Sequence, residues 1–229
     1  MKSKTYSPMA ICRIDPAVIA AVKNDREPWA VLWPAILTII VGSMCLGIAC
    51  GIWRSPVQAL YSAIKMPALI LSVTLAGSLI NTMLAQVLGT GLSFRQVWMC
   101  QGIGFAIASA WLGGISPVLL LFSLSAPSPA CAAGTMAYLV LLATLTVLVA
   151  IAGLWGNLRT YQLLARLTGS RSAALRLLGA WILVLGLTGC ELSWIMSPFL
   201  ARPDLPIPFF NPNAFNSNFF EYLWKMLVQ

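Results

Sequence analysis

One carboxylate draws attention because it interrupts a long apolar run. Glu191 lies within Leu187–Leu200, which reads LTGCELSWIMSPFL. A carboxylate inside a membrane segment is costly and often marks a proton or cation site in a transporter. Transporters normally carry several such groups, whereas Glu191 is alone, so we favour a structural role in which one neighbour satisfies it. Lys65 and Arg54 are the nearest cations by predicted depth, and the three residues form our candidate intramembrane polar site.

Other chemistry is restricted by the residue types that the sequence lacks. It contains no histidine, which excludes histidine-ligated metals, a Ser-His-Asp triad and an imidazole proton relay. Its six cysteines form no Cys-x-x-Cys pair, and four of them lie in apolar segments, where cysteine behaves as a small hydrophobic residue. We therefore expect no catalytic residues, no metal site and no cofactor, and we expect that the protein is not an enzyme.

The composition places the chain in a lipid bilayer. Of its 229 residues, 59% are hydrophobic and only 9% are charged, and the mean hydropathy is +0.86. Soluble domains carry roughly 25% charged residues, and a soluble fold of this size could not bury so much apolar surface. The net charge of +8 then indicates the basic bias of cytoplasmic loops, and we expect no nucleic-acid partner.

Five apolar stretches reach the roughly 20 residues that a helix needs to cross a bilayer. They predict an all-α, polytopic membrane helix bundle with about five transmembrane helices, and we expect additional interfacial amphipathic helices. The five predicted spans are Trp29–Trp53, Met66–Leu88, Val97–Phe122, Thr135–Trp155 and Leu177–Leu200.

Two connections carry helical patterns of their own. Segment 54–65 begins with a Ser-Pro pair typical of a helix start, and it predicts either a short interfacial helix or an early start of the second span. After Trp155, apolar residues continue at helical spacing with arginines beside them. We therefore expect the fourth span to extend out of the membrane as an amphipathic turn or two.

The C-terminal tail is rich in proline, asparagine and aromatic residues. Its prolines exclude a regular helix directly after the fifth span. Asn216 or Ser217 can then cap a last amphipathic helix, whose aromatic side chains we expect at the level of the lipid headgroups. The alternative is a tail packed against the protein's own surface. The predicted interfacial anchors are Phe219, Phe220 and Trp224.

Lysine and arginine are distributed unequally between the two sides. The N-terminal segment and alternate loops hold ten of them, against four on the other side. The positive-inside rule therefore predicts a cytoplasmic N-terminus and an external C-terminus in an inner (plasma) membrane. We divide the chain into a cytoplasmic N-terminal segment, 1–28, a five-helix transmembrane domain, 29–200, and a C-terminal tail on the outer face, 201–229.

Small residues recur at four-residue spacing on two predicted spans. Such stripes let helix backbones approach closely in lipid, either within one bundle or against a partner chain. The stripes are Ser43, Gly47 and Gly51 on the first span, and Gly102, Ala106, Ala110 and Gly114 on the third. We also expect Asn81, Gln86 and Gln101 to form hydrogen bonds between helices, with a polar conduit as the alternative.

Two stretches carry a resemblance to known proteins. SPVQALYSAIKMPALIL at Ser55–Leu71 resembles the entry into the second span of bacterial members of Yip1-like groups. ELSWIMSPFL at Glu191–Leu200 and the following FFNPNAFNSNFFEYLW resemble the end of an uncharacterised bacterial multi-pass group. The five-span layout, with a cytoplasmic N-terminus, is similar to that of Yip1-type membrane proteins.

The resemblance implies a membrane organiser or trafficking scaffold, and it carries over no catalytic residues. We accordingly expect a non-enzymatic membrane subunit or scaffold that contacts the lipid bilayer and packs with other membrane protein chains, as a homo- or hetero-oligomer. The alternative is a small transporter or channel subunit that uses Glu191.

Overall fold

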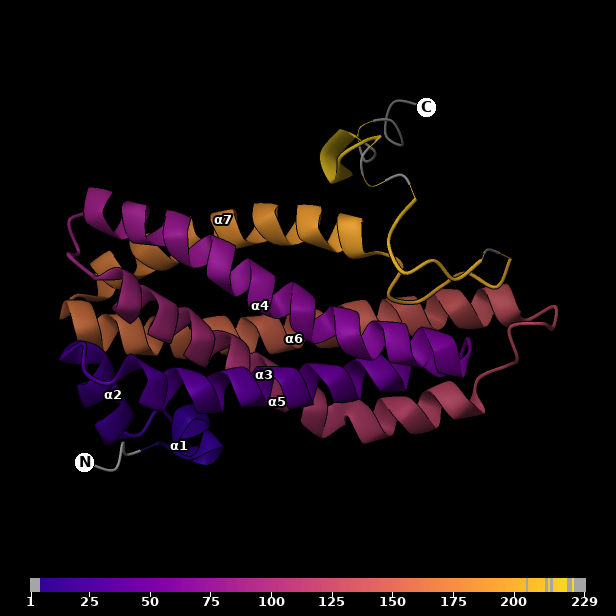
Figure 1. Cartoon of the computed structure of the whole chain (residues 1–229), viewed down its shortest axis with the longest axis horizontal. Coiled ribbons are helices and arrows are strands. Elements are labelled where there is room, and N and C mark those ends of the chain that lie inside the picture. Colours follow the sequence, from indigo (N-terminus) through magenta and orange to yellow (C-terminus); the bar gives the residue numbers. More distant parts are fainter. Residues whose placement is uncertain (1–4, 205, 213, 215, 222–223, 225–229) are drawn as a thin grey trace.

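The computed structural model describes residues 5–204, 206–212, 214, 216–221, and 224. Over these residues the chain is helical and shows no strand. Figure 1 shows the long helices α3 to α7 lying along the long axis of the molecule, with the short helices α1 and α2 at one end and the tail toward the other. The helices are α1 Pro8–Arg13, α2 Pro16–Lys23, α3 Pro28–Gly51, α4 Pro56–Val87, α5 Phe94–Ser125, α6 Gly134–Thr168 and α7 Arg171–Met196. Helices α3 to α7 are each long and apolar enough to cross a membrane, which confirms the predicted class of fold.

The second span starts early, and no separate interfacial helix precedes it. Ser55 caps α4 by accepting a hydrogen bond from the backbone N–H of Gln58, and Pro56 occupies the first turn, where its missing N–H costs nothing. From there α4 runs through Pro67 to Val87 without a break. The segment that was open to two interpretations therefore forms the first turns of α4.

The ends of the last two helices follow from local chemistry. The predicted extension of the fourth span is confirmed, because α6 continues to Thr168, where Gly169 adopts a left-handed conformation that ends helices. The fifth span was expected to reach Leu200, but α7 ends at Met196. Ser197 precedes a proline, and that position disfavours helical geometry. Glu191 consequently lies five residues from the end of α7, about 8 Å along the helix, whereas the predicted span to Leu200 placed it nine residues from the end.

Glycines bring α3 close to two neighbours. A Cβ atom added to Gly51 would lie 2.6 Å from the Cα of Ala59 on α4, and one added to Gly47 would strike the backbone of Ser62. On another face of α3, a Cβ on Gly113 of α5 would lie 2.8 Å from the Cα of Gly42. These backbone contacts pack α3 tightly against α4 and α5.

The two predicted stripes therefore serve packing inside the chain along most of their length. Gly114 differs, because it is exposed and an added Cβ would meet nothing within 4 Å. Of the remaining members, Ala110 is half-buried, and the buried ones are Ser43, Gly47, Gly51, Gly102 and Ala106. Gly42, which contacts α5, was not part of either stripe.

The N-terminal segment is folded onto the bundle. Ile11, Val18 and Val22 are buried against a cluster that includes residues of α3, α5 and α6. Gln96 of α5 donates hydrogen bonds of 3.1 Å to the carbonyl oxygens of Val22 and Lys23, which fixes the end of α2. These two helices were not predicted from the sequence, and the apolar residues within this segment are the signal that could have indicated them.

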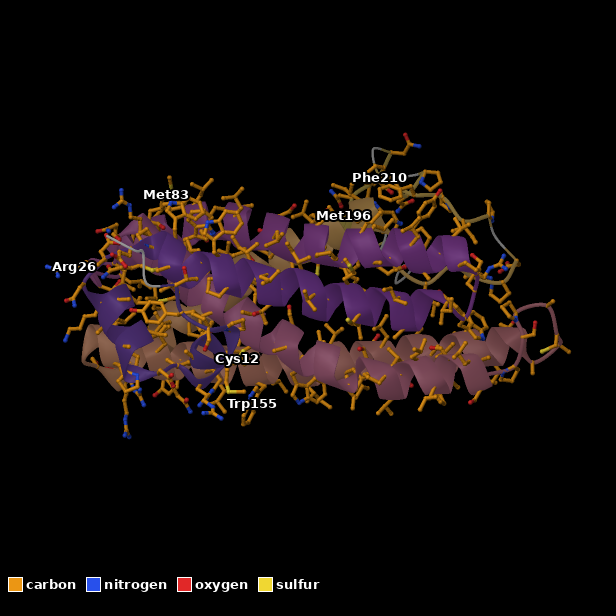
Figure 2. All side chains as sticks on the ribbon, turned by 60° about the horizontal axis from the view of Figure 1, so that its bottom comes forward. Cys12, Arg26, Met83, Trp155, Met196 and Phe210 are labelled. Atoms are coloured by element: carbon orange, nitrogen blue, oxygen red, sulfur yellow. The ribbon has the colours of Figure 1, made fainter. Side chains whose placement is uncertain are left out.

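Basic side chains gather at the end of the bundle that carries α1 and α2. Figure 2 shows Arg26 and Met83 at that end and Met196 and Phe210 toward the other. The described lysines and arginines at the α1–α2 end are Arg13, Lys23, Arg26, Arg95, Arg159, Arg166, Arg171 and Arg176. Those toward the tail end are Arg54, Lys65 and Arg202.

Candidate functional site

Lys65 is buried, and it holds the tail. Its side chain is 1% exposed, and its ammonium group donates a 3.0 Å hydrogen bond to the carbonyl oxygen of Pro198. The ring of Phe209 lies 5.1 Å from the same nitrogen and the ring of Tyr61 lies 6.0 Å from it. Aromatic faces at these distances stabilise a desolvated cation. The positive charge of Lys65 is therefore compensated by a carbonyl and two rings.

Other side chains, at the start of α4 and just before it, bind neighbouring tail carbonyls. The amide nitrogen of Gln58 donates a 2.9 Å hydrogen bond to the oxygen of Phe199, which also accepts from the hydroxyl of Ser62. Arg54 donates a 3.0 Å hydrogen bond to the oxygen of Pro203. We refer to Arg54, Gln58, Ser62 and Lys65 together as the tail clamp.

Glu191 holds the tail from α7, at a different point. One carboxylate oxygen accepts a 3.3 Å hydrogen bond from the backbone N–H of Phe219. Nearby, the indole of Trp194 donates to the oxygen of Ser217 at 2.9 Å. Glu191 is half-buried and forms no ion pair with Lys65 or Arg54. The three residues of the predicted polar site thus all contact the tail, but they do not meet in one charged site.

The start of the last helix lies slightly later than expected. The side-chain oxygen of Asn218, and not that of Asn216 or Ser217, accepts a 2.6 Å hydrogen bond from the N–H of Glu221. Of the predicted anchors, Phe219 is half-buried, Phe220 is 41% exposed and Trp224 is 68% exposed. The rest of the predicted helix, including Leu223 and Leu227 of its apolar face, lies outside the described residues.

A large cavity lies beneath the tail. It has a volume of about 800 Å³ and lies between α4, α6, α7 and the residues that follow Met196. We call it the outer cavity. Its walls are mainly apolar, and residues that line it include Met66, Leu145, Val149, Trp194, Phe199 and Pro208. The tail clamp holds Phe199 in this wall, so the clamp sets the shape of the cavity.

A second cavity lies deeper in the bundle, between α4, α5, α6 and α7. Its volume is about 340 Å³, and we call it the inner cavity. Both volumes fall within or near the range of small-molecule sites. Leu69 lines both cavities, so they are neighbours along one face of α4. Residues that line the inner cavity include Val73, Gln101, Phe105, Thr160, Trp181 and Leu185.

Missing side chains help to create the inner cavity. Gly153 of α6 and Gly186 of α7 both line it, and a Cβ added to either would meet nothing within 4 Å. Glycine in a membrane helix is common enough that neither position signals a cavity in the sequence alone. The space becomes evident only when four helices are placed together.

Two buried amides lie toward the α1–α2 end of the bundle. Gln101 is 3% exposed, and its side-chain oxygen accepts a 3.0 Å hydrogen bond from Ser78, which confirms the expected link between the second and third spans. Its amide nitrogen has no partner among the described residues. Asn81 is fully buried, and neither polar atom of its side chain has a partner there. Gln86 instead bonds the nearby carbonyl of Leu92 at 2.9 Å.

The fold defines a multi-pass membrane protein whose apolar helices contact lipid. No family model, no curated protein and no solved structure matches the chain. Over the described residues, no group of three or more cysteine, aspartate or glutamate side chains gathers as it would around a metal ion. Any function must therefore be argued from the tail clamp, the two cavities and the surfaces beside them.

Proposed function

We propose that this chain is a non-enzymatic membrane protein that binds a lipid-soluble molecule between α4, α6 and α7. The single observation that carries this proposal is the pair of adjoining cavities, about 800 Å³ and 340 Å³, that share Leu69. Sites for small molecules are concave and mostly apolar, with a few polar groups that orient the ligand. The outer and inner cavities have this character.

The proposal includes a location. We infer an inner (plasma) membrane with the N-terminus in the cytoplasm and the tail outside. Support comes from the charge distribution, because eight described lysines and arginines lie at the α1–α2 end and three lie toward the tail. In this orientation the inner cavity lies closer to the cytoplasmic leaflet, and the outer cavity opens beneath the tail.

Photochemical labelling tests the binding proposal. The full chain, in nanodiscs, is exposed to an acyl lipid that carries a diazirine on its chain, and the adducts are mapped by peptide mass spectrometry. We expect adducts on residues that line the outer cavity, such as Leu145 and Val149. Val149→Trp should fill part of that cavity and lower its labelling severalfold.

Val147 provides the matched control, because it is an exposed valine on the same helix that does not line either cavity. Val147→Trp should leave labelling of the cavity unchanged. Adducts spread evenly over all exposed faces of α3 to α7, with no response to Val149→Trp, would mean that the probe reports only surrounding lipid and would refute the proposal.

A scaffold role is the second candidate, and the exposed aromatic residues of the tail favour it. Phe220 and Trp224 present much of their surface, and aromatic residues are enriched where membrane proteins contact partners or headgroups. The resemblance to Yip1-type proteins is compatible with this role. Purification in mild detergent followed by mass measurement tests it: a co-purifying chain that is lost on Trp224→Ala supports a scaffold, and a clean monomer contradicts it.

The transporter alternative receives less support from the geometry. Glu191 bonds the tail backbone and belongs to no chain of ionisable groups among the described residues. A proton pathway normally needs several such groups. We therefore do not extend the proposal to transport.

A further inference from the structure

One side chain that lines the inner cavity, that of Gln101, carries a buried polar atom that the described residues leave unsatisfied. Gln101 lines the cavity, and its amide nitrogen has no hydrogen-bond partner among the described residues although the side chain is only 3% exposed. A buried donor without a partner costs about 1–3 kcal/mol. A group that supplies the missing acceptor would recover part of this cost.

We propose that the inner cavity binds an apolar chain that carries an uncharged oxygen acceptor, and that the amide nitrogen of Gln101 donates to this oxygen. The inference rests on the proposed function, because it names the chemistry of the molecule that the cavities hold. Gln101 acts here as the specificity-determining residue. The remaining walls contribute apolar contact through residues such as Val73, Phe105 and Leu185.

The dimensions agree with a single chain of one lipid leaflet. On α7 the lining runs from Leu178 to Gly189, which is about 16 Å along the helix. The hydrocarbon core of a bilayer is about 30 Å thick, so the cavity matches roughly half of it. Gln101 lies seven residues from the start of α5, which is about 10 Å along the helix. It is therefore at the end of the cavity nearer to α1 and α2, where the basic side chains gather.

The charge of the ligand follows from the surroundings. The residues that line the inner cavity include no lysine, arginine, aspartate or glutamate. A charged group would remain uncompensated there, at a large desolvation cost. A carbonyl needs only one donor, and the buried amide nitrogen of Gln101 is an unpartnered donor in a residue of this lining, which also includes the partly exposed Asn157. Both an acyl ester and a prenyl quinone present such a carbonyl on an apolar chain.

Competition against a hydrocarbon photoprobe tests this inference on the full chain. The competitors are a long-chain ketone, the alcohol of the same length and the parent alkane, each compared between the wild type and Gln101→Leu so that partitioning into detergent cancels. We expect the ketone to compete about three- to tenfold better against the wild type than against Gln101→Leu, the range that one hydrogen bond supplies. The alkane should compete equally against both.

Two further arms identify the natural source of the carbonyl. An acyl ester and a prenyl quinone are added as competitors, and the one whose advantage depends on Gln101 is the class that the cavity prefers. Ser109→Ala serves as the control, since Ser109 is also a buried, unpartnered polar residue of α5 but does not line the cavity. It should leave every competition unchanged.

Further variants separate a failure of the proposed binding function from a failure of the assignment to Gln101. Gly186→Leu should block labelling of the inner cavity, whereas Gly179→Leu should not, because Gly179 is on the same helix and has open space around it but lies outside the cavity lining. Labelling that ignores Gly186→Leu refutes the proposed binding function itself. If labelling responds to Gly186→Leu but the ketone competes no better than the alkane in the wild type, only the assignment to Gln101 is overturned. An advantage of the alcohol alone would mean that the amide presents its oxygen, and it would overturn the assignment as well.

Discussion

The ammonium group of Lys65 donates a hydrogen bond to the carbonyl oxygen of Pro198, although the two residues are 133 positions apart. This bond joins the first turns of α4 to the first residues after α7. Charged side chains are rarely buried without a carboxylate, and here a carbonyl and two aromatic rings take its place. The contact ties the position of the tail to α4 and therefore to the wall of the outer cavity.

Lys65→Met should release the tail while leaving the bundle intact. A methionine of similar volume removes both the hydrogen bond and the cost of burying the charge, so we expect the free energy of unfolding to change by less than about 1 kcal/mol. Hydrogen exchange of backbone amides in 199–212 should become at least about tenfold faster. Lys23→Met, at an exposed lysine, is the matched control and should change neither quantity. Unchanged exchange in Lys65→Met would contradict the clamp.

The two roles of Glu191 are separated by two substitutions. Glu191→Gln keeps a side-chain oxygen that can accept from the N–H of Phe219, so exchange of that amide should stay slow. Glu191→Leu removes the acceptor and should speed this exchange by a factor that corresponds to about 1–2 kcal/mol. If the tail moves equally in both variants, the charge matters more than the hydrogen bond, and the transporter alternative regains support.

Backbone contact between helices predicts a steep difference among small-to-large substitutions. Gly47→Leu and Ala106→Leu place a bulky side chain where the bundle is closed, and each should cost at least about 3 kcal/mol or prevent folding. Gly114→Leu adds the same type of side chain in open space and should be tolerated. The midpoint of thermal unfolding in detergent and the yield of protein in the membrane both measure the difference between the variants. Comparable losses in all three variants would contradict the packing described for α3 and α5.

Cysteine labelling tests the topology of the chain and the reactivity of the Cys12 thiol. In variants with one cysteine each, Cys131 in the loop before α6 should react with an impermeant maleimide from outside, and an introduced Asn24→Cys only after the membrane is opened. Partial burial raises the pKa of Cys12 above its ordinary value, although the nearby Arg159 opposes the shift. A raised pKa means less thiolate at a given pH, so Cys12 should label more slowly than Asn24→Cys near neutral pH and should gain rate as the pH rises. The reverse accessibility of Cys131 and Asn24→Cys would invert the proposed orientation.

Much of the fold could be predicted because lipid imposes it. Each of the five spans shows a long apolar stretch, and the caps at Ser55 and the glycine at Gly169 mark ends that the sequence displays locally. The end of α7 was placed four residues late because apolar side chains continue to Leu200 beyond the break before Pro198. Hydropathy records what a side chain prefers, and it does not record where the backbone stops being helical.

The candidate site was only partly predictable, for a different reason. The sequence indicated Lys65 as a cation near Glu191 by predicted depth, but its partner is a backbone carbonyl, and every residue has one. The inner cavity depends on which glycines of α6 and α7 face each other across the bundle, and no local pattern contains that information. Gln101 was recognised as a link between helices, whereas its second polar atom became notable only once the neighbours of the amide were known.

The packing of α1 and α2 against the bundle has a practical consequence for handling the protein. Helix α6 is 35 residues long, about 50 Å, so its last turns emerge well beyond the roughly 30 Å of hydrocarbon. Ile11, Val18 and Val22 shield apolar surface at that level, where detergent and lipid tails do not reach. Shortening the chain from its N-terminus past Ser7 would expose this surface to water and promote aggregation, so affinity tags belong ahead of Ser7 with these two helices retained.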